Sequence, residues 1–239
     1  MRIRPRYITY LPNLLLNFIF PNSCLVCGSS LKYDSTNKLK QSSICASCID
    51  ELTYAETSKS ILTNLLDFFG YENLYIDSVS SMIDIKRDKG FMKAIYELKY
   101  FGNRRVGYDL GRILGNKLQS ELSLGQYQAI QALPLHKAKE RERTYNQSLY
   151  IAKGISEVAN LPIIDCAKRT INTTTQTQLS ANDRQKNVKD IFKMKKRLKH
   201  ESILLVDDVL TTGATVNSLA KVLKENGAKT IGVATIVKA

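Results

Sequence analysis

The sequence lacks any run of about 20 apolar residues, the length that a membrane-spanning helix needs. It also contains no internal repeat and no low-complexity tract, so neither a repeat array nor a compositionally biased chain is expected. Glycine (12) and proline (5) are scattered, and 44% of the residues are hydrophobic, which is typical of a globular protein. A chain of 239 residues has room for one full domain and a small appendage.

Acidic residues are few compared with basic ones. There are 22 Asp and Glu against 35 Lys and Arg, which gives a formal net charge of +13. This excess predicts attraction to polyanions such as nucleic acids, nucleotides or anionic membranes. The alternative is a solvated basic surface that only aids solubility, and charge alone does not decide between the two.

A cleavable signal peptide is not expected, although basic residues within Met1–Arg6 precede the apolar stretch Leu14–Phe20. Asn13 and Asn17 interrupt the apolar region, and no small-residue cleavage site follows before the first cysteine. We interpret this segment as an amphipathic packing or docking element. We therefore expect a cytoplasmic protein, whose thiols stay reduced.

Four of the five cysteines form two C-x2-C pairs, Cys24 with Cys27 and Cys45 with Cys48, at a spacing typical of zinc sites. A two-residue gap lets both thiolates face one ion, so two such pairs predict a closed, structural Zn²⁺ site with four protein ligands. Gly28 suits the tight turn after Cys27. Disulfides and a redox-active pair are the alternatives, and both are disfavoured in a reducing compartment without a thioredoxin-like context.

Downstream of the cysteines, strand-like and helix-like segments alternate. This predicts an α/β fold with a mostly parallel sheet flanked by helices on both faces. The expected strands are 75–85, 128–133, 161–166, 202–207 and 230–237, and the expected helices are 55–75, 91–99, 104–122, 146–159 and 215–225. We expect three regions: an N-terminal segment with a zinc ribbon (1–54), a helical and extended connector (55–90), and the α/β domain (91–239). Cys166 is expected to be a small buried hydrophobe.

The segment at the carboxyl end of the expected strand at 202–207 combines acids, threonines and a glycine before a helix. These residues are Asp207, Asp208, Thr211, Thr212, Gly213, Ala214 and Thr215. Ligands of open α/β sheets bind beyond the carboxyl ends of the strands, and a helix N-terminus offers free N–H groups to a phosphate. The threonines would add donors, and the glycine would let the backbone approach closely. The acids would repel phosphate but can accept hydrogen bonds from ribose hydroxyls, with Mg²⁺ nearby, so the pattern predicts a ribose 5-phosphate site.

This segment resembles the phosphoribosyl-pyrophosphate motif of the phosphoribosyltransferases, which is an apolar strand, two acids and a T-T/S-G-x-T loop. The resemblance implies that 91–239 is a phosphoribosyltransferase-like domain whose ligand is phosphoribosyl pyrophosphate accompanied by Mg²⁺. An ordinary strand–turn–helix with a turn rich in threonine and glycine is the alternative.

Three further stretches resemble the ComF family of competence-associated proteins, in the right order along the chain. Tyr96–Gly102 is similar to its K-Y-x-G helix end, Ala132–Gln147 to its P-L-H…R…R-G-x-N-Q stretch, and 176–188 to its T-x-x-Q-x-x-L…R-x-x-N-V stretch. The four-cysteine ribbon is also a feature of that family. Thr144 stands where the family usually has glycine, which leaves the shape of that loop open.

The stretch after the expected strand at 128–133 supplies further candidate residues. They are Leu135, His136 and Lys137 for a pyrophosphate loop and Lys139, Arg141 and Arg143 for a basic loop. By resemblance, the first group could hold pyrophosphate through its backbone. The basic residues could neutralise pyrophosphate or grip a nucleic-acid backbone, and a solvated loop is the alternative. His136 could be an acid or base, although a lone histidine beside a turn is more often structural. Asn146 and Gln147 could instead cap the next helix.

The resemblance implies a protein that binds phosphoribosyl pyrophosphate and single-stranded DNA in natural competence, with proteins of the DNA-uptake machinery as candidate partners. An active phosphoribosyltransferase of nucleotide salvage or synthesis is one alternative, although no base-recognition hood is evident. A structural module with a relict nucleotide site is another. No aromatic platform for stacking bases is obvious. Glutamine amidotransferase activity is not expected, because the first cysteine, Cys24, lies inside the predicted zinc pair.

Overall fold

A computed structural model describes residues 23–31, 42–52, 54–84, 90–171 and 191–239. The chain divides into a smaller unit, residues 1–51, and a larger unit, Leu52–Ala239. The expected amphipathic segment at the N-terminus, the loop between the cysteine pairs and the ComF-like stretch at 176–188 lie outside the described residues. The smaller unit contains the short helix α2 (Ala46–Asp50).

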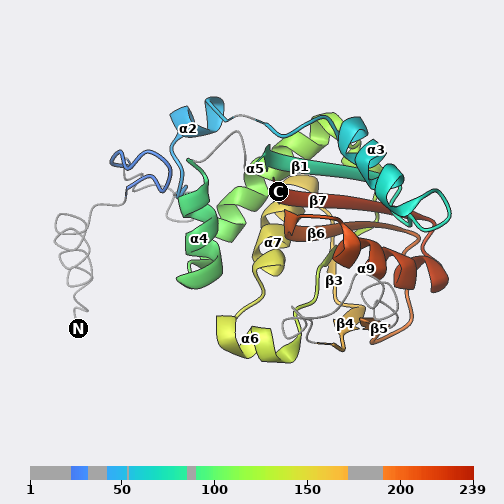
Figure 1. Ribbon diagram of the computed structural model, residues 1–239. Helices are drawn as coiled ribbons and strands as arrows, with labels where there is room; N and C mark the ends of the chain where they lie inside the picture. Colours follow the sequence, from blue (N-terminus) through green and yellow to red (C-terminus); the bar gives the residue numbers. More distant parts are fainter. Residues whose placement is uncertain (1–22, 32–41, 53, 85–89, 172–190) are drawn as a thin grey trace, which may run out of the picture. The chain divides into compact units, whose positions relative to one another are not determined.

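Within the described part of the larger unit, five parallel strands form one sheet in the order β1-β7-β6-β2-β3 (Figure 1). A separate antiparallel pair, β4 and β5, forms a small second sheet. In chain order the elements are α3 (Ser58–Phe69), β1 (Ser78–Asp84), α4 (Met92–Tyr100), α5 (Arg104–Glu121), β2 (Ala129–Ala132), α6 (Lys137–Arg143), α7 (Gln147–Ala159), β3 (Ile163–Ile164), β4 (Ala167–Arg169), β5 (Phe192–Met194), β6 (Ser202–Leu210), α9 (Ala214–Glu225) and β7 (Thr230–Lys238). The expected α/β fold with a mostly parallel sheet flanked by helices is confirmed.

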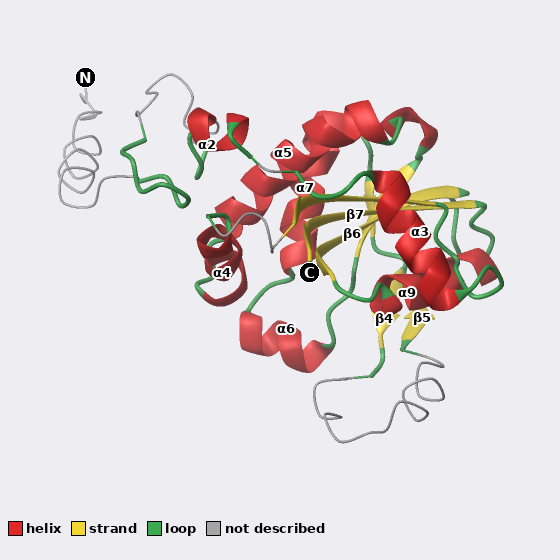
Figure 2. Ribbon diagram, turned by 45° about the horizontal axis from the view of Figure 1, so that its top comes forward, coloured by secondary structure: helices red, strands yellow, loops and turns green. Residues whose placement is uncertain are grey.

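Helices cover both faces of the sheet, with α3 and α9 on one face and α5 and α7 on the other (Figures 1 and 2). The central strand β6 is therefore buried on both sides. Ile203 and Leu205 belong to the core that contains α3 and α9, and strand alternation turns the buried Leu204 and Val206 toward α5 and α7. A continuous apolar run is what such a strand requires.

The helices α5 and α7 pack unusually closely. A Cβ added at Gly111 would lie 2.1 Å from the carbonyl oxygen of Ile151, and one added at Gly154 would lie 2.2 Å from that of Tyr108. Glycine at both positions is thus required by backbone-to-backbone packing between the two helices. This contact fixes α7 against α5, and the first turn of α7 contributes to the site below.

Three expectations need correction. The segment 55–90 is not a connector, because α3 covers the sheet and β1 is its edge strand, paired with β7. Strand β6 continues to Leu210 through its pairing with β7, so the two acids lie within the strand and not at its carboxyl end. The expected basic loop is the helix α6.

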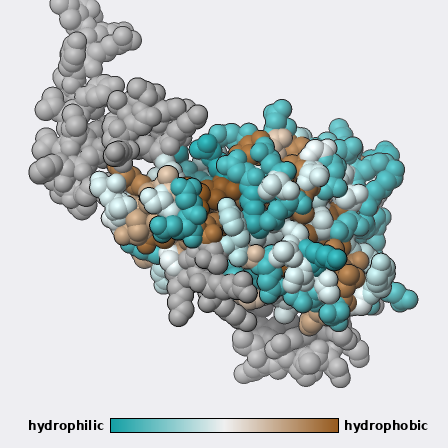
Figure 3. All heavy atoms as spheres, turned by 90° about the horizontal axis from the view of Figure 1, so that it is seen from above, coloured by the Kyte–Doolittle hydropathy of each residue, from teal (hydrophilic) through white to brown (hydrophobic). Residues whose placement is uncertain are grey.

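Among the residues that the structure describes, no helix is both long and apolar enough to cross a membrane. The face seen in Figure 3 carries mostly hydrophilic side chains with apolar ones between them.

Candidate functional site

The predicted motif lies where β6 ends and α9 begins. Gly213 caps α9 with φ +78°, a left-handed conformation that favours glycine. A Cβ at this position would also come within 2.7 Å of Leu65 Cδ2 on α3, so a side chain here would have to displace Leu65. Thr211 and Thr212 are exposed, and the N–H of Ala214 donates to Thr212 Oγ1 at 3.4 Å. The turn therefore presents hydroxyls and the start of a helix to solvent, as a phosphate site requires.

Asp207 is held by two donors. Ser148 Oγ donates to Asp207 Oδ1 at 2.9 Å, and the backbone N–H of Asp208 donates to the same oxygen at 2.9 Å. Burial, and then the neighbouring charge of Asp208, raise the pKa of Asp207 to about 7, against this hydrogen bonding. A carboxyl group with such a pKa changes its protonation state near neutral pH, which is common at ligand-binding sites.

The start of α7 fixes the position of Ser148. Asn146 caps this helix, since its Oδ1 accepts the N–H of Ser148 at 3.1 Å. Its Nδ2 also donates to the carbonyl oxygen of Leu133 at 2.9 Å, which ties the helix to the end of β2. The predicted capping role of Asn146 is confirmed.

Cationic side chains from three other elements interact electrostatically with the acid pair. Lys99, at the end of α4, lies 3.4 Å from Asp208 Oδ2. Burial lowers the pKa of Arg169 on β4, and the charge of Asp207 opposes that change. Burial likewise lowers the pKa of Lys139, with Arg143 and Arg169 adding to the effect, while Glu142 and Asp208 act against it. So many partly buried cations around two carboxylates provide contacts for an anionic ligand that also carries hydroxyl groups.

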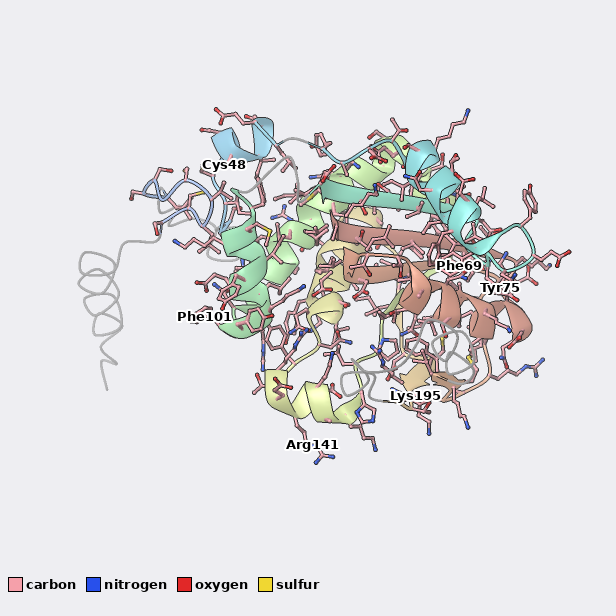
Figure 4. All side chains as sticks on the ribbon, in the orientation of Figure 1. Cys48, Phe69, Tyr75, Phe101, Arg141 and Lys195 are labelled. Atoms are coloured by element: carbon pink, nitrogen blue, oxygen red, sulfur yellow. The ribbon has the colours of Figure 1, made fainter. Side chains whose placement is uncertain are left out.

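The four basic residues of α6 fall into two pairs. Lys139 and Arg143, four residues apart on one helix face, are half-buried, whereas Lys137 and Arg141 are exposed. Arg141 points away from the sheet (Figure 4). The basic loop expected from the sequence is thus a helix that directs one pair of cations inward and the other outward.

His136 begins α6, and its Nδ1 accepts the N–H of Ala138 at 3.3 Å. This geometry favours a structural, capping role for His136 over an acid–base role. A lone histidine beside a turn often has such a capping role.

A cavity of about 620 Å³ adjoins this region. Its lining includes the predicted pyrophosphate loop (Leu135, His136 and Lys137) together with Asn146, Lys168, Arg169 and Lys195. Lys195 comes from the segment after β5 (Figure 4), where its Nζ pairs with Asp165 at 2.6 Å. The cavity therefore joins the predicted pyrophosphate loop to the β4–β5 hairpin. The residues 207–215 do not line it.

Three residues of the site were not expected from the sequence: Lys99, Ser148 and Arg169. Lys99 lies in the K-Y-x-G stretch, and Ser148 directly follows the Asn146-Gln147 pair, so both were close to recognised patterns. Arg169 carries no local signal, because the β4–β5 hairpin brings it to the acid pair only in the folded chain.

The four paired cysteines form one cluster, with their sulfur atoms within 4.8 Å of one another. Cys24 and Cys48 Sγ are 3.9 Å apart, and Cys27 and Cys45 Sγ are 3.7 Å apart. Zn–S bonds of about 2.3 Å in a tetrahedron place two sulfurs about 3.8 Å apart, so these side chains fit a zinc ion. All five cysteines are free, which is against the disulfide alternative.

Hydrogen bonds prepare two of these thiols for metal binding. Gly28 has φ +77°, as expected for the first knuckle, and its N–H donates to the carbonyl oxygen of Cys24 at 2.9 Å. The Ser29 hydroxyl and backbone lower the pKa of Cys27 to about 6. Burial opposes ionisation of Cys24, but backbone N–H groups, including that of Cys45 at 3.3 Å, lower its pKa overall. Burial raises the pKa of Cys48. Uptake of a metal would deprotonate all four.

Part of the chain matches a known family of protein domains. Residues 146–239 match the phosphoribosyl transferase domain family. This part of the chain is similar to phosphoribosyl transferase domains. The match begins at the cap of α7 and includes the acid pair and α9, but not α4 or α6.

Relatives of this chain are named for competence and DNA use. The chain is 34% identical to Competence protein F of Haemophilus influenzae over 116 residues, 47% of this chain and 51% of that protein. It is 29% identical to DNA utilization protein YhgH of Escherichia coli K12 over 143 residues (58% and 63%) and 26% identical to Competence protein ComFC of Streptococcus pneumoniae over 129 residues (54% and 56%). The matches thus span between half and two thirds of these relatives. The expected resemblance to competence-associated proteins is confirmed.

A solved structure, that of the allosteric regulatory enzyme of purine biosynthesis, also matches. The two chains are 19% identical, and the match covers 59% of this chain and 30% of the enzyme's chain with a TM-score of 0.41.

Proposed function

We propose that this protein binds phosphoribosyl pyrophosphate at the acid pair of β6 and handles single-stranded DNA in natural competence, in the cytoplasm. The observation that supports the ligand most directly is the grouping of Asp207 and Asp208 with the start of α9, amid cations from α4, α6 and β4. The DNA part is supported by the net charge of +13 and by the names of the relatives. Proteins of the DNA-uptake machinery are candidate partners.

Each part of the ligand would meet groups of matching chemistry. The ribose hydroxyls would donate to the two carboxylates, and the 5-phosphate would accept from the threonine hydroxyls and the first N–H groups of α9. The pyrophosphate would lie toward the loop at Leu135–Lys137, near the inward-facing Lys139 and Arg143. Carboxylate oxygens are also suitable ligands for Mg²⁺, which would neutralise charge on the ligand when bound. Zn²⁺ would be held by Cys24, Cys27, Cys45 and Cys48 and would stabilise the smaller unit.

Calorimetric titration of the whole protein with phosphoribosyl pyrophosphate, with and without Mg²⁺, tests the ligand. We expect saturable binding that is lost when Asp207 and Asp208 are both changed to alanine. A matched control removes two exposed acids elsewhere, Asp67 and Glu225, and should bind as the wild type does. Unchanged affinity in a folded D207A/D208A protein contradicts the proposal. Salt-sensitive binding of single-stranded DNA, and loss of transformation on deletion, test the DNA part.

An active phosphoribosyltransferase is the second candidate, and the cavity of about 620 Å³ beside the pyrophosphate loop favours it. A cavity of this volume can accept a small-molecule acceptor such as a nucleobase. Catalysis would release pyrophosphate from the ligand, so incubation with the common nucleobases and a pyrophosphate assay tests it. Binding without release leaves a ligand-binding or regulatory role, and the absence of both supports a structural module with a relict site.

A further inference from the structure

Three large aromatic side chains are exposed together at the end of α4. Tyr96 is 55% exposed, Tyr100 63% and Phe101 66%. Six large hydrophobic side chains are exposed among the described residues, and these three are half of them. The ring centroids of Tyr96 and Tyr100 are 4.6 Å apart, and those of Tyr96 and Phe101 are 5.8 Å apart. We call these three residues the α4 aromatic cluster; Figure 4 labels Phe101.

The helix does not need these rings for its own packing. Its inner face is already buried through Phe91, Ala94, Ile95 and Leu98. Tyr96 and Tyr100 are four residues apart and therefore lie on one outward face. A contiguous exposed apolar surface of this kind usually marks an interaction site, since single exposed rings are common but clusters are not.

Basic residues border the cluster. Between residues 91 and 105 the chain has four basic side chains, Lys93, Lys99, Arg104 and Arg105, and one acidic side chain, Glu97. Lys93 and Arg104 are exposed, and the Arg104 guanidinium lies 5.5 Å from the ring centre of Tyr145. Flat rings with positive charges around them fit a ligand that combines flat, unpaired bases with phosphates. A purely apolar partner would gain nothing from the charges.

We propose that the α4 aromatic cluster is the surface on which bases of single-stranded DNA stack, with the exposed Lys93 and Arg104 contacting the phosphates. This inference rests on the proposed DNA-handling function and names its surface. Duplex DNA would not bind in this way, because its bases are paired and stacked inside the helix. Lys99 ends the same helix and pairs with Asp208, so the DNA surface and the phosphoribosyl site share one element.

The composition permits a direct optical test, because the chain has no tryptophan. A Tyr100→Trp variant would carry a single indole that can still stack. Titration with oligo-dT should quench its emission as bases stack on the ring. Tyr71→Trp is the matched control: Tyr71 is 89% exposed on the loop after α3, and its reporter should not respond.

Affinity measurements separate stacking from charge. Changing Tyr96 and Tyr100 to leucine keeps an apolar surface but removes the rings. We expect affinity for single-stranded DNA to fall on the order of tenfold for each ring. The dependence of affinity on salt should stay the same, because no phosphate contact is lost, whereas Lys93→Ala should flatten that dependence. Phenylalanine at both tyrosine positions should restore binding.

These outcomes separate a failure of the proposed stacking surface from a failure of the proposed DNA-handling function. If the wild-type protein binds no single-stranded DNA, both proposals are wrong. If it binds DNA but Y96L/Y100L binds equally well, the surface is wrong and the function stands. Equal loss for duplex DNA, tighter ring-dependent binding of single-stranded RNA, or a dimer that dissociates on ring removal would each overturn the inference. Calorimetry with phosphoribosyl pyrophosphate should give wild-type affinity for Y96L/Y100L, which verifies that its fold is intact.

Discussion

Replacing Asp207 with asparagine should stabilise the protein above neutral pH and weaken its binding of phosphoribosyl pyrophosphate. The pKa of Asp207 is raised from 3.8 to about 7, with burial as the main cause. A raised pKa means that the folded state holds its proton more tightly than the unfolded state does. The associated stability is fully present below pH 3.8 and is lost as the pH rises through 7.

The size of the effect follows from the shift. A shift of about three pKa units, at 1.36 kcal/mol per unit, limits the destabilisation by the ionised carboxylate to about 4 kcal/mol. Partial exposure of the side chain reduces this destabilisation to about 2–4 kcal/mol. Asparagine resembles the protonated carboxyl, and its Oδ1 can still accept from Ser148 and from the N–H of Asp208. The advantage of D207N should therefore grow between about pH 4 and pH 7 and stay constant above that range.

Urea denaturation in Mg²⁺-free buffer at several pH values, followed by circular dichroism, measures this effect. The Asp208→Asn variant is the control. The charge of Asp208 is the second cause of the raised pKa of Asp207. D208N should therefore gain less stability above neutral pH than D207N, and it also loses the ion pair with Lys99. If D207N gains no stability at pH 8.5, or gains as much at pH 4, the assignment of a buried, destabilised carboxylate is wrong.

Three further variants test other parts of the structure. Gly213→Ala should cost about 1–2 kcal/mol from the left-handed backbone alone, and more from overlap with Leu65, with loss of ligand affinity by calorimetry; full stability would contradict the described turn. Thr144 has φ +64°, so Thr144→Gly should raise stability by roughly 0.5–1 kcal/mol in thermal melts while Thr144→Ala does not, and no difference between the two would refute the strain. Cys45→Ser should lower the zinc content from one ion per chain, as metal analysis can measure, whereas Cys166→Ser should retain it.

Several features of the fold follow directly from the sequence. The continuous apolar run at Ile203–Val206 predicts a strand buried on both faces, and alternation of strands with helices predicts a parallel sheet. The motif at 207–215 and the two cysteine pairs are local patterns, in which spacing alone brings the groups together. The sequence left the loop at Thr144 open, and the structure gives this residue φ +64°, a left-handed conformation. The buried strand and the parallel sheet are confirmed, whereas the ligands of the motif and of the cysteine pairs stay predictions.

Other features were missed because they depend on long-range packing. The segment 55–90 looked like a connector, yet β1 completes the sheet by pairing with β7, which lies far away in the sequence. The basic stretch at 137–143 has no apolar periodicity, so nothing in it indicated the helix α6. The α4 aromatic cluster was overlooked for a similar reason: tyrosines on a helix can be buried or exposed, and only the packing of α4 shows which face is outward.

The sequence by itself determined the type of fold, the resemblance to competence-associated proteins, the two cysteine pairs and the acid–threonine–glycine motif, because each depends on neighbours in the chain. Only the tertiary structure decided which cations meet the acids. Lys99, Lys139 and Arg169 belong to three different elements, and their approach to Asp207 and Asp208 depends on how those elements pack around the sheet. Burial, which raises the pKa of Asp207, is likewise a property of the folded chain, since no local pattern specifies how much water a side chain loses.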